Sequence, residues 1–282
     1  MNESDSLSIR DLLRVRPGFK LAEFDTQRIL AGPSDKEQAR DEALAFETQV
    51  TALQERLFAA SKGGSKQRLL IVLQGMDTSG KGGAVKAFDR ITEPLGRHIT
   101  SFGPPTKEEL GHHFLWRIEK GLPPPGTVGI FDRSHYEDVL IVRVRNLVSP
   151  DEWEVRYDEI NAWEKKWTEN GVVFLKCMLH VSKAEQKQRL LDRLDDPTKH
   201  WKYDPGDVDE RKLWDDYQDA YQAMLDRCST RHAPWYVIPA DHKWHRNWLL
   251  SKLVTETLRE MDPQYPPTRF DVEVETARLK SS

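Results

Sequence analysis

The sequence predicts one α/β domain in which a parallel β-sheet carries helices on both faces. Three observations support this prediction. Short apolar runs alternate with helical patterns along the chain, a glycine-rich turn joins the first such run to a helix, and charged side chains follow the ends of two runs. A chain of 282 residues is long enough for one such domain with extensions. In sheets of this kind, ligands bind beyond the carboxyl ends of the strands.

The composition argues against several classes of protein. A formal net charge of −4 is the opposite of what a general nucleic-acid-binding protein needs. Cys177 and Cys228 are the only cysteines and lie far apart, so we expect a reducing cytoplasm rather than a disulfide framework. The polar start lacks the apolar segment of a signal peptide, and no run is long enough to span a membrane. A soluble cytoplasmic protein without a membrane partner is therefore expected.

The first 34 residues form a polar extension, which is expected to pack on the domain or on a neighbouring subunit. Ser34 is predicted to cap the next helix, because Glu37 three residues later completes a capping box. Apolar residues at helical spacing extend this helix to about Ala60. The main domain is predicted over 35–262, and the tail over 263–282 is expected to be extended and partly exposed.

The remaining elements follow from apolar periodicity and from turn residues at the ends of each segment. The predicted strands cover 69–73, 98–102, 127–131, 172–181 and 235–238. The predicted helices cover 84–91, 107–120, 136–146, 151–169, 183–194 and 244–261. Thr106 and Ser182 are the expected N-caps of the second and the fifth of these helices.

The turn after the first strand fits G-x-x-x-x-G-K, the phosphate-binding loop, and lies between a strand and a helix as that motif requires. Its glycines let successive N–H groups point at an anion, and the positive end of the helix adds to that field. Lys81 is expected to reach the terminal phosphates as a mobile charge. The predicted phosphate contacts of the loop are Gly75, Thr78, Ser79, Gly80, Lys81, Gly82 and Gly83.

Two positions depart from the usual loop. Gly82 stands where a serine or threonine normally supplies a Mg²⁺ ligand, and Asp77 occupies the third position. An acidic residue in a phosphate cradle is repulsive unless a cation or a proton lies between, so we interpret Asp77 as a metal ligand or as a partner of the attacking group. The alternative is a surface turn with an incidental lysine, which the agreement of strand, turn and helix disfavours.

A second group of site candidates follows the third strand. Asp132 and Arg133 end that strand, so we expect them to lie beside Asp77 and Lys81 at the same edge of the sheet. Asp77 and Asp132 would hold Mg²⁺ against phosphate oxygens, and Arg133 offers several planar donors to a phosphoryl group. An ordinary Asp–Arg pair at a strand end is the alternative.

A third group lies on the fifth predicted helix and after it. Arg189 and Arg193 are four residues apart and share one helical face. The segment at about 193–212 mixes cations, aromatic residues and chain breakers, which suits a lid over a charged ligand; a solvated connector is the alternative. Lys86 follows Lys81 on the first helix after the loop and could extend a positive track, although a solvated face explains it equally well.

Taken together, these motifs resemble polyphosphate kinase family 2. The resemblance extends from about Phe19 to Tyr265, and Glu137, which is commonly Asn in class I members, makes it most similar to class III. The motifs that carry it are Gly75-x-Asp77-x-x-Gly80-Lys81-Gly82, Asp132-Arg133-Ser134-His135-Tyr136-Glu137-Asp138, the segment from Arg193 to Asp207, and Ala233-Pro234-Trp235-Tyr236-Val237-Ile238-Pro239-Ala240.

The resemblance implies a P-loop kinase core of the thymidylate-kinase type, with three α/β/α layers, a five-stranded parallel sheet and a helical lid. It also implies reversible transfer of the terminal phosphoryl group of inorganic polyphosphate to AMP and ADP, giving ADP and ATP, with guanine nucleotides as possible further acceptors. Mg²⁺, or alternatively Mn²⁺, would be the cofactor. Family members are commonly homo-oligomers, so a dimer or tetramer is expected.

The resemblance also implies roles for individual residues. Asp77 and Asp132 would organise the metal and the accepting phosphate, and these two with Arg133 and Glu137 would bind the nucleotide. The residues expected to neutralise the transferring phosphoryl group or to hold the polyphosphate chain are Lys81, Lys86, Arg133, Arg193, Lys199 and Lys202. Two rival functions stay open: an ATP-dependent nucleoside monophosphate kinase, and a non-catalytic module that binds polyphosphate or nucleotide.

Overall fold

The computed structural model describes residues 8–30 and 32–282, so the first seven residues of the predicted extension and Ala31 lie outside the described part. Five parallel strands form one sheet in the order β2–β3–β1–β4–β5. The strands are β1 Arg68–Gln74, β2 Arg97–Ser101, β3 Val128–Asp132, β4 Val172–His180 and β5 Trp235–Pro239. All five predicted strands are confirmed, each within one residue at either end.

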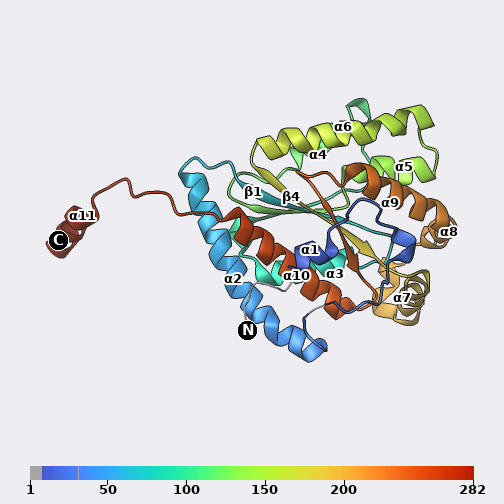
Figure 1. Cartoon of the computed structure of the whole chain (residues 1–282), viewed down its shortest axis with the longest axis horizontal. Helices are drawn as coiled ribbons and strands as arrows, with labels where there is room; N and C mark the ends of the chain where they lie inside the picture. The colour runs from blue at the N-terminus through green and yellow to red at the C-terminus, as the bar shows by residue number, and fades with distance from the viewer. Residues whose placement is uncertain (1–7, 31) are drawn as a thin grey trace.

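Helices cover both faces of the sheet, as Figure 1 shows, so the predicted α/β/α architecture is confirmed. On one face the helices α2, α3 and α10 pack on one another, and on the other α6 packs on β4 and α9. These five helices are α2 Lys36–Lys62, α3 Lys81–Ile91, α6 Pro150–Glu169, α9 Trp214–Cys228 and α10 Lys243–Met261. None of the helices in the described part combines the length and the apolar character that a membrane span requires.

The remaining helices are short or lie at the ends of the strands. The α-helices are α1 Ile9–Leu13, α4 Leu115–Lys120, α5 Ile141–Val144, α7 Lys183–Asp195, α8 Gly206–Lys212 and α11 Val272–Lys280. The 3₁₀ helices are η1 Leu21–Glu23, η2 Pro94–Gly96, η3 Glu109–Gly111, η4 His135–Val139 and η5 Pro197–Lys202.

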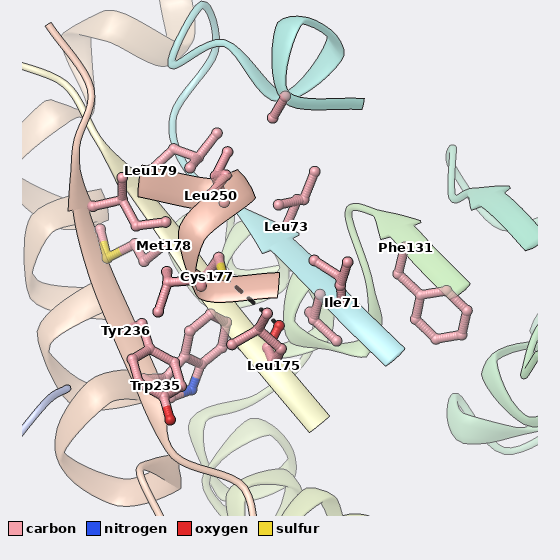
Figure 2. Close-up of a cluster of buried hydrophobic side chains, with 14 of the residues drawn as sticks. Ile71, Leu73, Phe131, Leu175, Cys177, Met178, Leu179, Trp235, Tyr236 and Leu250 are labelled. Carbon is pink, nitrogen blue, oxygen red and sulfur yellow. Dashed lines mark hydrogen bonds between the residues drawn. The ribbon is translucent and has the colours of Figure 1, made fainter. Parts of the chain in front are cut away.

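The core lies between the central strands and the helices on either face. Every residue of β1 is buried, because this strand has a neighbour on each side and helices above and below. Ile71 and Leu73 of β1 line the same small gap as Leu250 of α10, and Figure 2 shows these side chains grouped beside β4. Continuous apolar runs of this kind are what a parallel sheet covered on both faces requires.

The described part of the N-terminal extension packs on its own domain, which is one of the two expected arrangements. Val15 donates its N–H to the carbonyl of Trp235 at 2.9 Å, and Arg14 forms an antiparallel bridge with Tyr236. Leu13 and Leu21 are buried. The extension therefore lies along β5, at one edge of the sheet.

Two predicted helices are interrupted in the structure. Thr106 accepts from the N–H of Glu109 at 3.2 Å but does not cap the predicted helix, because only the turn η3 follows before the chain becomes extended at His112, and α4 begins at Leu115. The helix predicted over 136–146 is divided into η4 and α5 at Leu140, whose φ of −105° and ψ of −90° are not helical. Periodicity predicted one long helix in each case, and it carries no information about such local breaks.

Other predictions were wrong in smaller ways. Asp35, not Ser34, caps α2, because its side chain accepts from the N–H groups of Glu37 and Gln38. The tail is not extended throughout, since it contains α11, which lies away from the domain in Figure 1. The helix α9 was not predicted at all. Ser182 caps α7 as predicted, accepting from the N–H of Glu185 at 3.0 Å.

Candidate active site

The glycine-rich loop connects β1 to α3 at the carboxyl edge of the sheet. Gly75 has φ +150°, and a Cβ atom there would lie 2.5 Å from the carbonyl oxygen of Leu179, so the loop needs glycine at this turn. Lys81 is the first residue of α3, and its Nζ donates to the carbonyls of Gly75 at 2.6 Å and Met76 at 3.3 Å. The lysine thus closes the loop on itself and places its charge at the start of the helix.

Two buried arginines hold the loop from behind. Arg189 donates to the carbonyls of Thr78 and Ser79 at 2.8 and 3.2 Å, and Arg246 donates to Ser79 at 3.2 Å. A Cβ atom on Gly80 would lie 1.7 Å from the guanidinium of Arg246, so glycine is required there by space as well as by its φ of +106°. Burial lowers the pKa of Arg246 to about 10. Thr78 has the strained φ of +60°, and the arginines help to fix that conformation.

Arg133 is brought to the loop by the parallel register of β1 and β3, which pairs Leu73 with Asp132. Its backbone adopts a left-handed conformation, φ +65°, and its guanidinium lies 3.4 Å from the carboxylate of Asp77. Burial alone would lower the pKa of Arg133, but the carboxylates of Glu137, Asp77 and Asp132 outweigh it and raise the pKa. The predicted neighbourhood of these side chains at the sheet edge is therefore present in the structure.

Glu137 approaches the same place from η4. Burial raises the pKa of Glu137, and the carboxylate of Asp77 raises it further, while Arg133 and Lys81 lower it. Asp207 of the predicted lid shows the same pattern, since burial and then Asp77 raise its pKa. The carboxylate of Asp77 therefore repels both Glu137 and Asp207 at the edge of the loop.

Two cavities meet at the loop. The larger, of about 880 Å³, is called here the cationic cavity, because eight Lys and Arg side chains and only three carboxylates line it. The eight are Lys81, Lys86, Arg133, Arg189, Arg193, Lys199, Lys202 and Lys243. The smaller, of about 330 Å³, is called the acidic cavity, because Asp77, Glu137, Asp204, Asp207 and Glu210 line it together with Lys81 and Arg133. Asp77, Lys81 and Arg133 border both cavities.

The predicted lid residues divide between the two cavities. Arg193, Lys199 and Lys202 border the cationic cavity, although the guanidinium of Arg193 also binds the lid itself, through the carbonyl of Lys202 at 2.8 Å and the carboxylate of Asp207 at 3.1 Å. The exposed Lys199 pairs with Asp196 at 2.7 Å. These contacts fold the segment into η5 and α8 above the loop.

Contacts across the acidic cavity tie the lid to the domain. Arg145, which follows α5, binds Glu210 of α8 at 2.6 Å, and the hydroxyl of Tyr217 donates to the same carboxylate at 2.5 Å. Arg211 donates to Gln186 at 2.9 Å, and Gln186 donates to the carbonyl of Asp77 at 3.1 Å. A continuous set of hydrogen bonds therefore joins α8 to the glycine-rich loop.

The structure brings nearly all predicted site residues to these cavities. Besides the cations named above, those on the cationic cavity are Asp77, Thr78, Gly80, Gly82, Gly83 and Asp132, and those on the acidic cavity include Gly75, Asp77 and Glu137. Ser79 borders neither, because its side chain is buried and its N–H donates to the carbonyl of Met76 at 3.1 Å. Lys243 and Arg246 were missed, since they start the last helix and only the tertiary fold brings them to the loop.

Asp77 and Asp132 provide oxygen ligands of the kind that Mg²⁺ prefers. Both carboxylates border the cationic cavity, and the repulsion of Glu137 and Asp207 by Asp77 favours a cation beside them. Among residues 8–30 and 32–282, no cluster of three or more His, Cys, Asp or Glu is arranged to hold a metal. Asp77 and Asp132 would supply two oxygen ligands, and an ion such as Mg²⁺ would take the others from phosphate oxygens and water.

Comparison with known proteins places the chain in a family. A family model described as Polyphosphate kinase 2 (PPK2) matches residues 33–266. The AMP/ADP-polyphosphate phosphotransferase of Meiothermus ruber is 44% identical over 255 residues, which cover 90% of this chain and 94% of the relative. The ADP-polyphosphate phosphotransferase of Rhodopseudomonas palustris is 38% identical over 228 residues, 77% of this chain and 78% of the relative.

A solved structure supports the same family assignment. The crystal structure of polyphosphate kinase 2 from Arthrobacter aurescens TC1 matches with a TM-score of 0.94 and 45% sequence identity, and the match covers 98% of both chains. The resemblance expected from the glycine-rich loop, the Asp132–Asp138 motif and the lid segment is thereby confirmed. The chain belongs to the polyphosphate kinase 2 family of phosphotransferases.

Proposed function

We propose that this enzyme transfers the terminal phosphoryl group of inorganic polyphosphate to AMP and to ADP, reversibly, giving ADP and ATP. One observation carries the proposal: a cavity whose charged residues are mostly cations and a second cavity whose charged residues are mostly carboxylates meet at Asp77, Lys81 and Arg133. A phosphoryl group passing between two ligands needs such a shared place. The name of the Meiothermus ruber relative agrees with these substrates.

The cationic cavity is the proposed site of the donor. Lys81, Lys86 and Arg133 line it on the domain side, and Lys199 and Lys202 line it from the lid. A linear polyanion gains favourable electrostatic energy along such a track, and it needs no other recognition because its repeating units are identical.

The acidic cavity is the proposed site of the acceptor nucleotide. Tyr217, Tyr221 and Leu140 provide flat and apolar surface for a nucleoside, whereas Glu137 and Asp77 repel its phosphates unless a cation intervenes. We propose that Mg²⁺ or Mn²⁺, held by Asp77 and Asp132, neutralises charge on the phosphate oxygens when bound.

The chemistry requires one bond to form and one to break. An oxygen of the acceptor phosphate bonds to the terminal phosphorus of polyphosphate, and the bond from that phosphorus to its bridging oxygen breaks, leaving a chain that is one unit shorter. Lys81 and Arg133, which border both cavities, would neutralise the equatorial oxygens of the transferring group. Arg193 is proposed to join them from the lid.

The proposal also includes the cellular location and the oligomeric state of the enzyme. We propose a cytoplasmic homo-oligomer, a dimer or a tetramer, which can use guanine nucleotides as further acceptors. Exposed apolar side chains at Leu147 and Val155 support contact between copies, because they offer apolar surface at the start of α6.

The direct test is nucleotide analysis after mixing the protein with Mg²⁺, long-chain polyphosphate and AMP, without ATP. The expected result is ADP followed by ATP. If only added ADP is converted, the family activity stands but the interpretation of Glu137 is wrong. If nothing forms until ATP is supplied, the enzyme is an ATP-dependent monophosphate kinase, and tight binding without turnover would identify a binding module.

A further inference from the structure

A lysine lies in the middle of the sheet, where the proposed chemistry does not use it. Lys176 of β4 pairs in register with Val72 of β1 and Trp235 of β5, and its side chain is fully buried. Its Nζ donates three hydrogen bonds of 2.7 Å, to the hydroxyl of Tyr136, to the carboxylate of Glu164 and to the carbonyl of Cys228. All three ammonium protons are therefore satisfied.

The partners of Lys176 also bind one another. The other oxygen of Glu164 accepts from the Tyr136 hydroxyl at 2.7 Å and lies 3.3 Å from Nε2 of His135. Burial lowers the pKa of His135, which keeps the ring neutral, so its proton belongs on the nitrogen that faces the carboxylate. Burial opposes the ionisation of Glu164, but Lys176 and His135 outweigh it and lower the pKa. We call these four residues the buried network.

The buried network lies directly behind the active site. His135 and Tyr136 are the first two residues of η4, the 3₁₀ helix that comes after Arg133 and contains Glu137. This helix has only five residues, and the Arg133 backbone before it is strained at φ +65°. The side chain of Ser134 caps the turn, accepting from the N–H of Tyr136 at 3.2 Å, and its hydroxyl hydrogen-bonds the side-chain amide of Gln74 of β1 at 3.0 Å. The contacts of η4 to β4 and α6 add the support that so short a helix does not supply itself.

Stability alone does not account for charges in this position. A buried ion pair is often no more stabilising than apolar side chains of similar volume, because both ions lose their hydration. What the network does provide is direction, since three of its contacts join side chains of η4 to Lys176 of β4 or to Glu164 of α6.

We propose that Lys176 and Glu164 are positioning residues, which hold η4 so that Arg133 and Glu137 face the junction of the two cavities. The test of this inference by kcat rests on the proposed function, whereas its test by amide hydrogen exchange does not. Neither residue touches a substrate in this account.

The test compares two variants of the full chain with wild type. The first replaces the polar groups together, Lys176→Met, Glu164→Leu and Tyr136→Phe, so that no buried charge is left without a partner. The second is Tyr136→Phe alone, which removes one hydroxyl. We expect the triple variant to melt within a few degrees of wild type, yet to lose at least tenfold in kcat, because small misplacements of reacting groups are costly. The KM for polyphosphate should change less than twofold, since most of the cationic cavity is unaltered.

Amide hydrogen exchange supplies the readout that does not depend on activity. In both variants, exchange over 134–140 should accelerate while exchange in α3 stays as in wild type. The matched control replaces an exposed ion pair that joins α6 to α4, Lys166→Met with Glu119→Leu, whose side chains lie 3.2 Å apart. This control should keep both kcat and the exchange pattern.

Three results would overturn the inference: full kcat in a stable triple variant, unchanged exchange over 134–140, or faster exchange throughout the protein in proportion to a lower melting temperature. If the triple variant does not fold, the Tyr136→Phe variant tests the inference instead. We expect it to show a several-fold lower kcat and faster amide exchange over 134–140. If wild type forms no ADP from polyphosphate, the proposed function fails, while the exchange data still support or overturn the positioning role.

Discussion

The cationic and the acidic cavity share Asp77, Lys81 and Arg133, yet the rest of their walls differ in charge and in origin. The cationic cavity is built from the loop, from α7, α10 and η5, and from the end of β2. The acidic cavity is built from η4, α8 and α9. The difference indicates how one site could tell two phosphate compounds apart: one wall attracts a bare polyanion, and the other accepts phosphate only together with a cation.

The two sides also differ in how they are held. Arg189 and Arg246, both buried, fix the loop beneath the cationic cavity. The acidic cavity is closed in part by Arg145 and Glu210, which are more exposed, and pairs of that kind contribute little stability. We therefore expect a rigid side that orients the donor and a side that can open for the nucleotide.

The largest expected effect comes from the residues at the junction. Asp77→Asn keeps the shape but removes a charge that borders both cavities, so turnover should fall by about two to three orders of magnitude while the fold is retained. Initial rates measure the loss of turnover, and the circular dichroism spectrum tests whether the fold is retained. Asp132→Asn tests the second carboxylate, and an enzyme with full rate after that change would contradict its role as a metal ligand.

A tenfold effect is expected on the acidic side alone. Glu137→Asn should lower kcat/KM for AMP about tenfold while changing it less for ADP, because the carboxylate lies in the proposed acceptor site. If the ionised form is the active one, the rate of wild type falls as pH falls through the raised pKa of Glu137, above the usual range for glutamate. Rates with each acceptor between pH 4 and 8 measure both effects. An unchanged acid limb in the variant would assign that limb to another group.

A smaller effect is expected on the cationic side alone. Lys86→Ala or Lys243→Ala should raise the KM for polyphosphate about fivefold, which corresponds to about 1 kcal/mol for one charge contact, and leave the KM for AMP unchanged. High salt should reduce the difference from wild type. Lys280→Ala, in the helix that lies away from the domain, is the control and should behave as wild type. Equal changes in both KM values would mean that the two cavities do not separate donor from acceptor.

The smallest expected effect is on the stability of the protein, through a histidine that lies beside the buried Arg246. Buried His245 precedes Arg246, accepts from the N–H of Leu30 at 3.0 Å, and has a pKa lowered to about 4 by burial. Neutral His245 contributes ~1–3 kcal/mol to the free energy of unfolding. This contribution is complete above the ordinary histidine pKa of about 6.5 and is lost as pH falls toward 4. The melting temperature should therefore fall by a few degrees over this range, and by less in His245→Gln. An equal fall in the variant would assign the acid sensitivity elsewhere.

The sequence predicted the parts of this enzyme whose pattern is local. The strands were predictable because parallel strands covered on both faces are continuous apolar runs, and the loop because it joins a strand to a helix. Arg246 carried no such signal, since only packing brings α10 against Gly80. Lys176 lies within an apolar strand, and the sequence pattern there does not show which residues from other elements would bind its charge. The break at Leu140 and the tail helix α11 depend on local backbone geometry that periodicity does not encode.

The contact between the N-terminal extension and β5 has a consequence for the behaviour of the protein in a crowded solution. An uncovered sheet edge presents free N–H and C=O groups, which can pair with another chain and start aggregation. Val15 and Arg14 occupy part of that edge on β5, while the opposite edge strand, β2, is short and begins with Arg97 and His98. One edge is thus shielded by the chain itself and the other by its polar character, so loss of the extension would uncover β5 and favour self-association.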